Sequence, residues 1–463
     1  MNDTARPAPM QLQLLPFMST GRLTRAPLYV IMAYVGFTFV MFLTWPINWP
    51  IFSGWDWAIL TLYVLLCLFA LASAAMVGAA GPTHMAAPMP GISWLLVAGA
   101  AAAAALLVPS CLAYTGRGPW EVLDALQNQG EAYRRLQFQL YFGESRERAL
   151  VVATRFLASP LMFAVLPLAI VHWRRIGWIG RLALAVSIAC SVVFSIMRGT
   201  DKEIADLFVI GFAALMVSFG RALTLTGKRA RVAKRLWLPV LIGLVLLFFA
   251  QGLFTERKQA RLRGFENKTI VCANASRICA DLDNGMIAWL PFNQRFGLSE
   301  FILATSSGWF GLHLAMHKPF ESSLGVGHSP AALSVYEALT GDDTPHKRTY
   351  TYRNGDDEWP EDNYWSTLIA WIANDVGFSG AVGVLALLGF AWGLWWREAA
   401  AGMSDPAAVL FVQATTMVFY LPANNQVFAA YEGYSIFFLW LAVWWWHRSR
   451  QRVYAALPVA VAT

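Results

Sequence analysis

The sequence predicts an all-α polytopic membrane protein, and three observations support this class. Of the 463 residues, 57% are hydrophobic and only 14% are charged, which is too apolar for a soluble globular chain of this length. Apolar runs recur along the chain, and residues 236–254 form 19 consecutive residues without a charge, close to the roughly 20 that cross the hydrocarbon core. Trp and Tyr cluster at the ends of these runs, as at Trp395, Trp396 and Trp444, because their amphipathic rings favour the membrane–water interface.

The apolar runs predict about ten transmembrane helices. The run that begins at Ala26 is long for a signal peptide and lacks a small-residue cleavage site, so we expect it to be the first span. The ninth run is short, and the tenth contains Glu432. The expected spans are residues 28–45, 57–78, 93–114, 149–173, 179–197, 204–219, 236–254, 378–396, 407–421 and 429–446.

Charged residues predict which side of the membrane each connection faces. The N-terminal tail, residues 174–181, 221–235 and 397–405, and the tail from His447 together carry 16 Lys and Arg against 3 acidic residues. Residues 255–377 instead carry 11 basic and 15 acidic residues. This asymmetry is the positive-inside pattern, so we expect both termini in the cytoplasm. The net charge of +7 then indicates contact with anionic lipid and no nucleic-acid partner.

The chain is accordingly divided into three parts. Residues 1–254 form the first seven helices, residues 255–377 form a large external loop, and residues 378–463 form the last three helices and a cytoplasmic tail. A loop of this size on one side indicates a site at that membrane face. It contains Cys272 and Cys279, with six residues between them, which can close a disulfide in an oxidising compartment. The alternative is two unrelated free thiols.

Two other stretches predict packing or surface helices. The small residues of 99–105 favour close approach of two helices. Residues 119–148 place Trp120, Leu123, Leu126 and Phe138 at helical spacing between charges, which is typical of a helix that lies along the membrane surface. Such a helix either anchors the protein or gates the access of a lipid substrate.

Three cations are candidates for binding an anion near the external face. Arg155 lies about two turns into the fourth span, where burial of a guanidinium costs about 2.5–3.5 kcal/mol, so it is expected to face the protein interior or a wet cavity. Arg198 and Lys202 share one helix face, which Asp206 continues. A guanidinium and an ammonium beside Gly199 would form a compact site for phosphate. The alternative is that these charges only pair with one another.

The external loop supplies further candidates. His328 lies in a Gly-rich turn, and histidine is a residue type that can serve as an acid, a base or a hydrogen-bond donor, although a lone loop histidine is often a bystander. Arg348 and Arg353 belong to a basic patch that either binds an anion or is a solvated face. Asp375 is expected at the external mouth of the bundle. His313 and His317 lack a third ligand at motif spacing, so no metal is expected.

These features together resemble the O-antigen polymerase family, the oligosaccharide repeat unit polymerases of bacterial inner membranes. The resemblance covers most of the chain in its architecture, and it is sharpest in residues 195–202 (SIMRGTDK), in the external loop, and in residues 371–380 (WIANDVGFSG). The related O-antigen ligases share this layout and carry a loop histidine before a polar residue and a later glycine. His328, Ser329 and Gly341 follow that pattern loosely.

The resemblance implies a GT-C-like enzyme at the periplasmic face that joins repeat units by inverting, metal-independent glycosyl transfer without a cofactor. Its donor would be an undecaprenyl-pyrophosphate-linked oligosaccharide, and its partners would include membrane lipid and a chain-length regulator. Arg155, Arg198 and Lys202 would then hold the pyrophosphate. The general base would be His328, Asp201 or Asp375, between which the sequence does not choose. A ligase-type glycan transferase and a transporter or flippase that uses Arg155 and Asp206 remain the alternatives.

Overall fold

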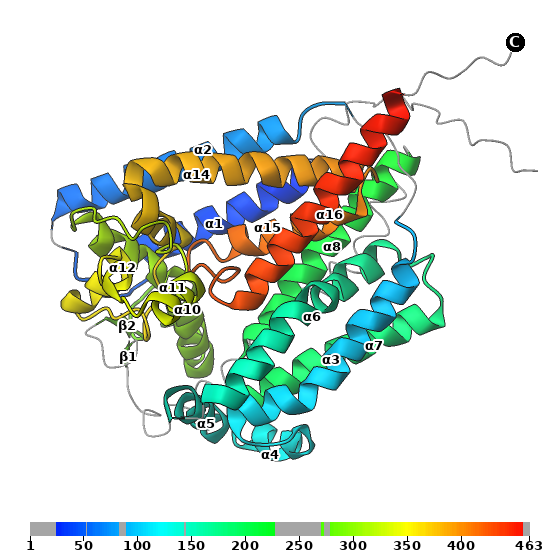
Figure 1. Ribbon diagram of the computed structural model, residues 1–463. Helices are drawn as coiled ribbons and strands as arrows, with labels where there is room; N and C mark the ends of the chain where they lie inside the picture. Colours follow the sequence, from blue (N-terminus) through cyan, green and yellow to red (C-terminus); the bar gives the residue numbers. More distant parts are fainter. Residues whose placement is uncertain are drawn as a thin grey trace, which may run out of the picture.

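In the part of the chain that the structure describes, almost all regular structure is α-helical (Figure 1). The structure, a computed structural model, describes residues 25–51, 53–82, 89–142, 145–226, 270–272 and 278–456. The expected seventh span, residues 236–254, lies outside the described residues, so the helices below account for the other nine expected spans.

Seven of the described helices are long and apolar enough to cross a membrane. Their outer faces are apolar as well: Leu62 and Phe69 on one helix are 68% and 71% exposed, which is favourable in lipid and costly in water. The fold is therefore that of a multi-pass helical membrane protein. The seven helices are α1 (Ala26–Thr44), α2 (Gly54–Gly78), α3 (Ile92–Thr115), α6 (Ser145–Val171), α7 (Trp178–Arg198), α8 (Lys202–Thr226) and α14 (Leu368–Ala400).

The expected spans one to six and eight fall on these seven helices. The expected ninth span corresponds to α15 (Asp405–Phe419), which has only 15 residues. The expected tenth span corresponds to α16 (Tyr431–Ala456), which has 26 residues and a polar second half. Neither α15 nor α16 is counted among the seven.

Small residues allow the central helices to pack closely. Gly389 and Gly393 on α14 are four residues apart, and a Cβ atom at either position would overlap a backbone carbonyl oxygen of α2. On α3, a Cβ atom at Gly99 would lie 2.5 Å from the carbonyl oxygen of Leu161 on α6. The Ala-rich run that begins at Gly99 therefore packs as the sequence predicts.

Helix α14 begins ten residues earlier than the expected eighth span. Thr367 caps it by accepting a hydrogen bond from the backbone N–H of Ala370. The helix is interrupted at Gly377, whose φ of 67° and ψ of 174° are not helical. Residues 368–376 therefore form a separate first part of α14, before the expected span, and the insertion that precedes this helix, in the expected large loop, runs up to residue 367.

The insertion that precedes α14 is packed against the bundle. The longest helix among its described residues, α10 (Phe292–Met316), lies beside α1, where Trp309 Nε1 donates to Thr38 Oγ1 at 3.4 Å. Three short helices follow, α11 (Pro330–Thr340), α12 (Thr344–Lys347) and α13 (Tyr350–Arg353), and then the 3-10 helix η3 (Asn354–Asp357). These elements gather at one end of the bundle, opposite the end to which α16 runs (Figure 1).

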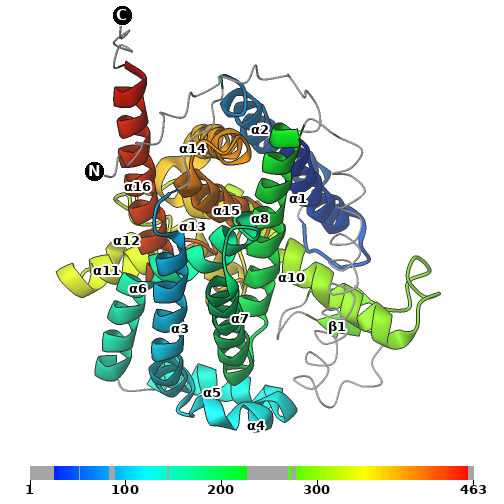
Figure 2. The same cartoon turned by 90° about the vertical axis from the view of Figure 1, so that its right-hand side faces the viewer.

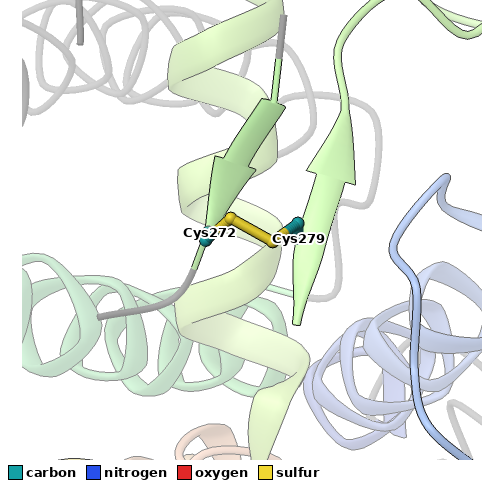
Figure 3. The surroundings of a disulfide bond; sticks show 2 residues. All are labelled: Cys272 and Cys279. Atoms are coloured by element: carbon teal, nitrogen blue, oxygen red, sulfur yellow. A yellow bond between two sulfur atoms is a disulfide. The ribbon is translucent and has the colours of Figure 1, made fainter. Parts of the chain in front are cut away.

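A short β-hairpin also belongs to the insertion. Strands β1 (Ile270–Cys272) and β2 (Cys279–Asp281) are antiparallel and place Cys272 opposite Cys279. The two cysteines form a disulfide (Figure 3). The backbone N–H of Asn48 donates to the carbonyl oxygen of Cys279 at 2.9 Å, so the hairpin is attached to the segment that follows α1.

The amphipathic stretch after α3 is helical. It consists of the 3-10 helix η2 (Pro119–Glu121), α4 (Val122–Gln127) and α5 (Gln129–Phe142). Helices α4 and α5 lie across the ends of α3 and α7 (Figure 2).

Candidate active site

The turn between α7 and α8 carries the first residues of the candidate site. Arg198 is the last residue of α7, and Gly199 follows it in the left-handed region with a φ of 61°. A Cβ atom at Gly199 would lie 2.5 Å from the backbone nitrogen of Tyr133 and 2.8 Å from the carbonyl oxygen of Gln129, both on α5. Glycine is therefore required at this position both for the backbone conformation and for the close approach of α5.

Arg198 is held by partners within this turn and on α3. Its guanidinium forms an ion pair with Glu203, and Thr200 Oγ1 donates to the same carboxylate at 3.0 Å. The guanidinium carbon also lies 5.2 Å from the ring centre of Phe194 and 5.5 Å from that of Tyr114, within the range of cation–π attraction.

Arg155 reaches the same aromatic ring from α6. Its guanidinium carbon lies 4.9 Å from the ring centre of Phe194. Its Nε donates to Glu432 Oε1 at 2.9 Å, and its Nη1 donates to Ser110 Oγ at 3.1 Å. Arg155 and Arg198, which are 43 positions apart in the sequence (198 − 155), therefore both pack against the ring of Phe194.

Lys202 and Asp206 form the stripe that their spacing predicts. Lys202 Nζ lies 2.9 Å from Asp206 Oδ2, and the hydroxyl of Tyr420, which follows α15, donates to Asp206 Oδ1 at 2.9 Å. Asp201 lies in the turn itself, where its carbonyl oxygen accepts from the backbone N–H of Ala205. The ends of α7, α8 and α15 thus meet at this site.

His328 and Asp375 form a second polar group. The Asp375 carboxylate accepts from the backbone N–H of Gly327 at 2.8 Å, from the backbone N–H of His328 at 2.9 Å and from Ser323 Oγ at 2.6 Å. His328 Nδ1 lies 2.8 Å from Asp375 Oδ2. Because an ionised carboxylate can only accept, we assign the proton to Nδ1, which leaves Nε2 as an acceptor.

Tyr434 on α16 completes this group. Its hydroxyl lies 2.7 Å from His328 Nε2, so in the assigned tautomer the hydroxyl donates and the imidazole accepts. Asn425 Nδ2 donates to the carbonyl oxygen of His328 at 2.6 Å, and the ring of Phe428 packs against both His328 and Tyr434. The imidazole is therefore held at both ring nitrogens, with Nε2 placed to take up a proton through the Tyr434 hydroxyl.

One turn of α16 connects the two groups. Glu432 pairs with Arg155, and Tyr434, two residues later, contacts His328. The paired guanidiniums and the oriented histidine therefore lie on either side of the same helix terminus. Such an arrangement can hold an anionic leaving group on one side and accept a proton on the other.

Two other expected binding residues, Arg348 and Arg353, lie apart from these two groups. Arg353 Nη1 donates to Glu321 Oε1 and its Nη2 donates to the carbonyl oxygen of Pro319, both at 2.8 Å, so it ties α13 to the segment before His328. Arg348 is exposed at the end of α12. Among the contacts of the described residues, neither arginine is joined to Arg155, Arg198 or His328.

The sequence did not identify Glu432, Tyr434, Asn425 or Phe428 as site residues. All four lie between the end of α15 and the first turn of α16, a segment that the sequence predicts to be a short connection and the start of the tenth span. Glu432 did provide a signal, because an acidic residue inside an expected span usually has a buried partner. The partner, Arg155, was itself a candidate.

The fold defines the class of this protein as a multi-pass helical membrane protein with a polar site at one end of the bundle. Comparison with known proteins adds no family to this class. No protein-family model, curated protein or solved structure matches the chain.

Proposed function

We propose that the protein polymerises lipid-linked oligosaccharides at the periplasmic face of the bacterial inner membrane, with both termini in the cytoplasm. The observation that carries this proposal is that the guanidinium groups of Arg155 and Arg198 both pack against the ring of Phe194. The His328–Asp375 pair lies on the other side of the first turn of α16. Two fixed cations suit a diphosphate leaving group, and an oriented histidine suits the activation of a hydroxyl.

The reaction follows from these roles. The acceptor hydroxyl oxygen forms a bond to the anomeric carbon of the donor, and the bond between that carbon and the diphosphate oxygen breaks with inversion. The leaving polyprenyl diphosphate keeps the electron pair, and Arg155 and Arg198 stabilise its charge. The acceptor hydroxyl passes its proton to the Tyr434 oxygen while Tyr434 passes its own proton to Nε2 of His328, and Asp375 stabilises the imidazolium. The residues of this chain thus account for each proton and charge in the transfer.

Replacement of Arg198 tests this proposal in cells that make the glycan. Arg198→Ala should abolish long chains while the amount of protein in the membrane stays unchanged, because the variant lacks a cation that stabilises the leaving group. Arg134→Ala is the matched control, since Arg134 is an exposed arginine on α5. Normal chain-length ladders in the Arg198→Ala strain would refute the proposal.

Deletion of the whole protein separates the alternatives. A polymerase predicts the accumulation of single-repeat products. Long lipid-linked chains that are not attached to a final acceptor would indicate a ligase. Labelling of a cysteine near Arg198 from the cytoplasmic side would instead support alternating access, as in a transporter or flippase.

A further inference from the structure

Each cation that we assign to the donor diphosphate already has a carboxylate partner. Arg155 pairs with Glu432, Arg198 with Glu203 and Lys202 with Asp206. A diphosphate that entered this neutral group without displacing a carboxylate would bring uncompensated negative charge into a partly desolvated site, which is unfavourable. Binding of the diphosphate therefore requires that at least one carboxylate moves away from its cation.

Two of the three pairs are local. Glu203 is bound to Arg198 within the turn between α7 and α8, where Thr200 also donates to it. Lys202 and Asp206 are one helical turn apart on α8. Both pairs therefore stabilise the turn that positions the cations. Only the pair of Arg155 and Glu432, whose sequence separation is 277, joins two distant segments without maintaining a local structure.

We propose that the Glu432 carboxylate occupies the phosphate position on Arg155, and that the donor diphosphate binds by exchange with it. This inference rests on the proposed function and identifies the group that the substrate must displace. The carboxylate oxygen lies 2.9 Å from Nε of Arg155, the position at which a phosphate oxygen would accept the same hydrogen bond.

The surrounding contacts determine what moves during this exchange. The carbonyl oxygen of Glu432 accepts from Ser159 Oγ at 3.3 Å, and that of Gly433 accepts from Gln413 Nε2 at 3.0 Å. A Cβ atom at Gly433 would overlap the carbonyl oxygen of Val427. The backbone of this turn is therefore fixed, and the exchange requires only that the Glu432 side chain rotates. Ser110 Oγ continues to accept from Nη1 of Arg155 during the exchange.

The exchange has a consequence for the class of ligand. A ligand must compete with a carboxylate that is held at a short distance and carries one negative charge. A polyprenyl diphosphate carries more charge and more acceptor oxygens than a polyprenyl monophosphate, so it displaces Glu432 more readily. The return of Glu432 to Arg155 would then assist release of the diphosphate product.

The test measures the affinity of the purified full chain for inorganic pyrophosphate and for farnesyl diphosphate. Glu432→Gln should lower Kd about three- to tenfold, the range that corresponds to loss of one partly buried charge competitor. Glu432→Asp keeps the charge but shortens the side chain, so direct exchange predicts a lower Kd for this variant too. Glu131→Gln, which removes an exposed acid on α5, is the matched control and should leave Kd unchanged.

The outcomes separate this inference from the proposed function. Tighter binding by both Glu432 variants supports exchange. Tighter binding by Glu432→Gln alone would show a general charge effect and would overturn the inference. The inference would also be overturned if Arg155→Ala weakens binding but Glu432→Gln leaves it unchanged or weaker. If Arg155→Ala and Arg198→Ala both leave Kd unchanged, the diphosphate site of the proposed function fails. A folding defect in Glu432→Gln would be detected by size-exclusion chromatography. In that case the Kd of Glu432→Asp tests the inference: a lower Kd than the wild type supports exchange, and an equal or higher Kd overturns it.

Discussion

At the scale of single residues, Asp375 determines the state of His328. Its carboxylate accepts from two backbone N–H groups, one hydroxyl and the imidazole. These donors fix both carboxylate oxygens, so the side chain cannot rotate away from the histidine. In the proposed mechanism, Asp375 therefore acts through His328, as an orienting and charge-stabilising group.

Replacement of Asp375 should lower the rate of glycosyl transfer with little change in the fold. In Asp375→Asn the side chain keeps its shape but presents an amide to His328, which favours the wrong tautomer. We expect kcat to fall by about 10²–10⁴-fold. Rates of chain elongation by the purified protein measure this effect. Asp343→Asn changes an exposed aspartate beside Lys347 and should be neutral; equal rates for both variants would remove Asp375 from the mechanism.

His346 predicts a dependence of stability on pH. Its hydrogen bond to Glu361 raises the pKa of His346 above its usual value of 6.5. A group whose pKa is raised by folding stabilises the protein fully below its unfolded pKa, and this contribution is lost as the pH rises through the folded pKa. Because the side chain is partly exposed, the contribution should not exceed about 1 kcal/mol.

Melting temperatures of the wild type and of His346→Gln, measured from about pH 6 to pH 8.5, check this sign. The wild type should lose more stability over this range than the variant. Parallel curves would show that the pair contributes nothing, and a steeper loss in the variant would show that the direction is wrong.

The sequence identified single residues better than it identified pairs. Arg155 was recognisable because a charge in a span is costly, and His328 and Asp375 were recognisable by their positions. The contact between His328 and Asp375 could not be predicted, because the two residues are 47 positions apart and the contact depends on the kink at Gly377. Tyr434 was concealed for a different reason, since an aromatic residue at the end of an apolar run is ordinarily an interfacial anchor.

At the scale of elements, the interruption of α14 is what brings Asp375 to the site. The first part of α14 is buried, with Leu368, Ile369 and Ala370 fully inaccessible. Asn374 joins this first part to the insertion, because its side chain accepts from the backbone N–H of Tyr350 and donates to the carbonyl oxygen of Gly327, both at 2.8 Å. The second part, after Gly377, packs along α2.

Replacement of Gly377 tests the role of this interruption. In Gly377→Ala the added Cβ atom would meet Phe320 only at ordinary contact distance, so the cost arises from the backbone conformation and should be about 1–3 kcal/mol. We expect a lower melting temperature and a loss of elongation activity, because Asp375 lies two residues away. Gly383→Ala is the matched control, since Gly383 lies in the helical second part with open space around it. An active, fully stable Gly377→Ala variant would contradict this account.

Hydropathy predicted the helices that face lipid, because their composition directly reflects their surroundings. It did not predict α10 or the first part of α14. These segments are buried by other protein elements, so they retain polar residues such as Ser299, Ser306 and Asn374, each with no exposed surface. Their hydrogen bonds are made within the protein, and such partners are not visible in a single sequence.

At the scale of the whole molecule, the site lies where the insertion meets the bundle. Arg155, Arg198, Lys202 and Glu432 come from helices of the bundle, whereas His328 comes from the insertion. The sequence predicted that the insertion carries function. It could not predict that α16, the last of the described helices, would connect the cations to the histidine.

The central claim is that Arg155 and Arg198 hold a departing diphosphate while His328 takes up, through Tyr434, the proton that the acceptor hydroxyl loses. The most direct measurement combines purified protein with a polyprenyl-diphosphate-linked repeat unit and follows both glycan length and released polyprenyl diphosphate. The account predicts one diphosphate released for each glycosidic bond formed by the wild type, and neither product with Arg198→Ala or His328→Ala. Elongation at the wild-type rate by either variant would contradict it.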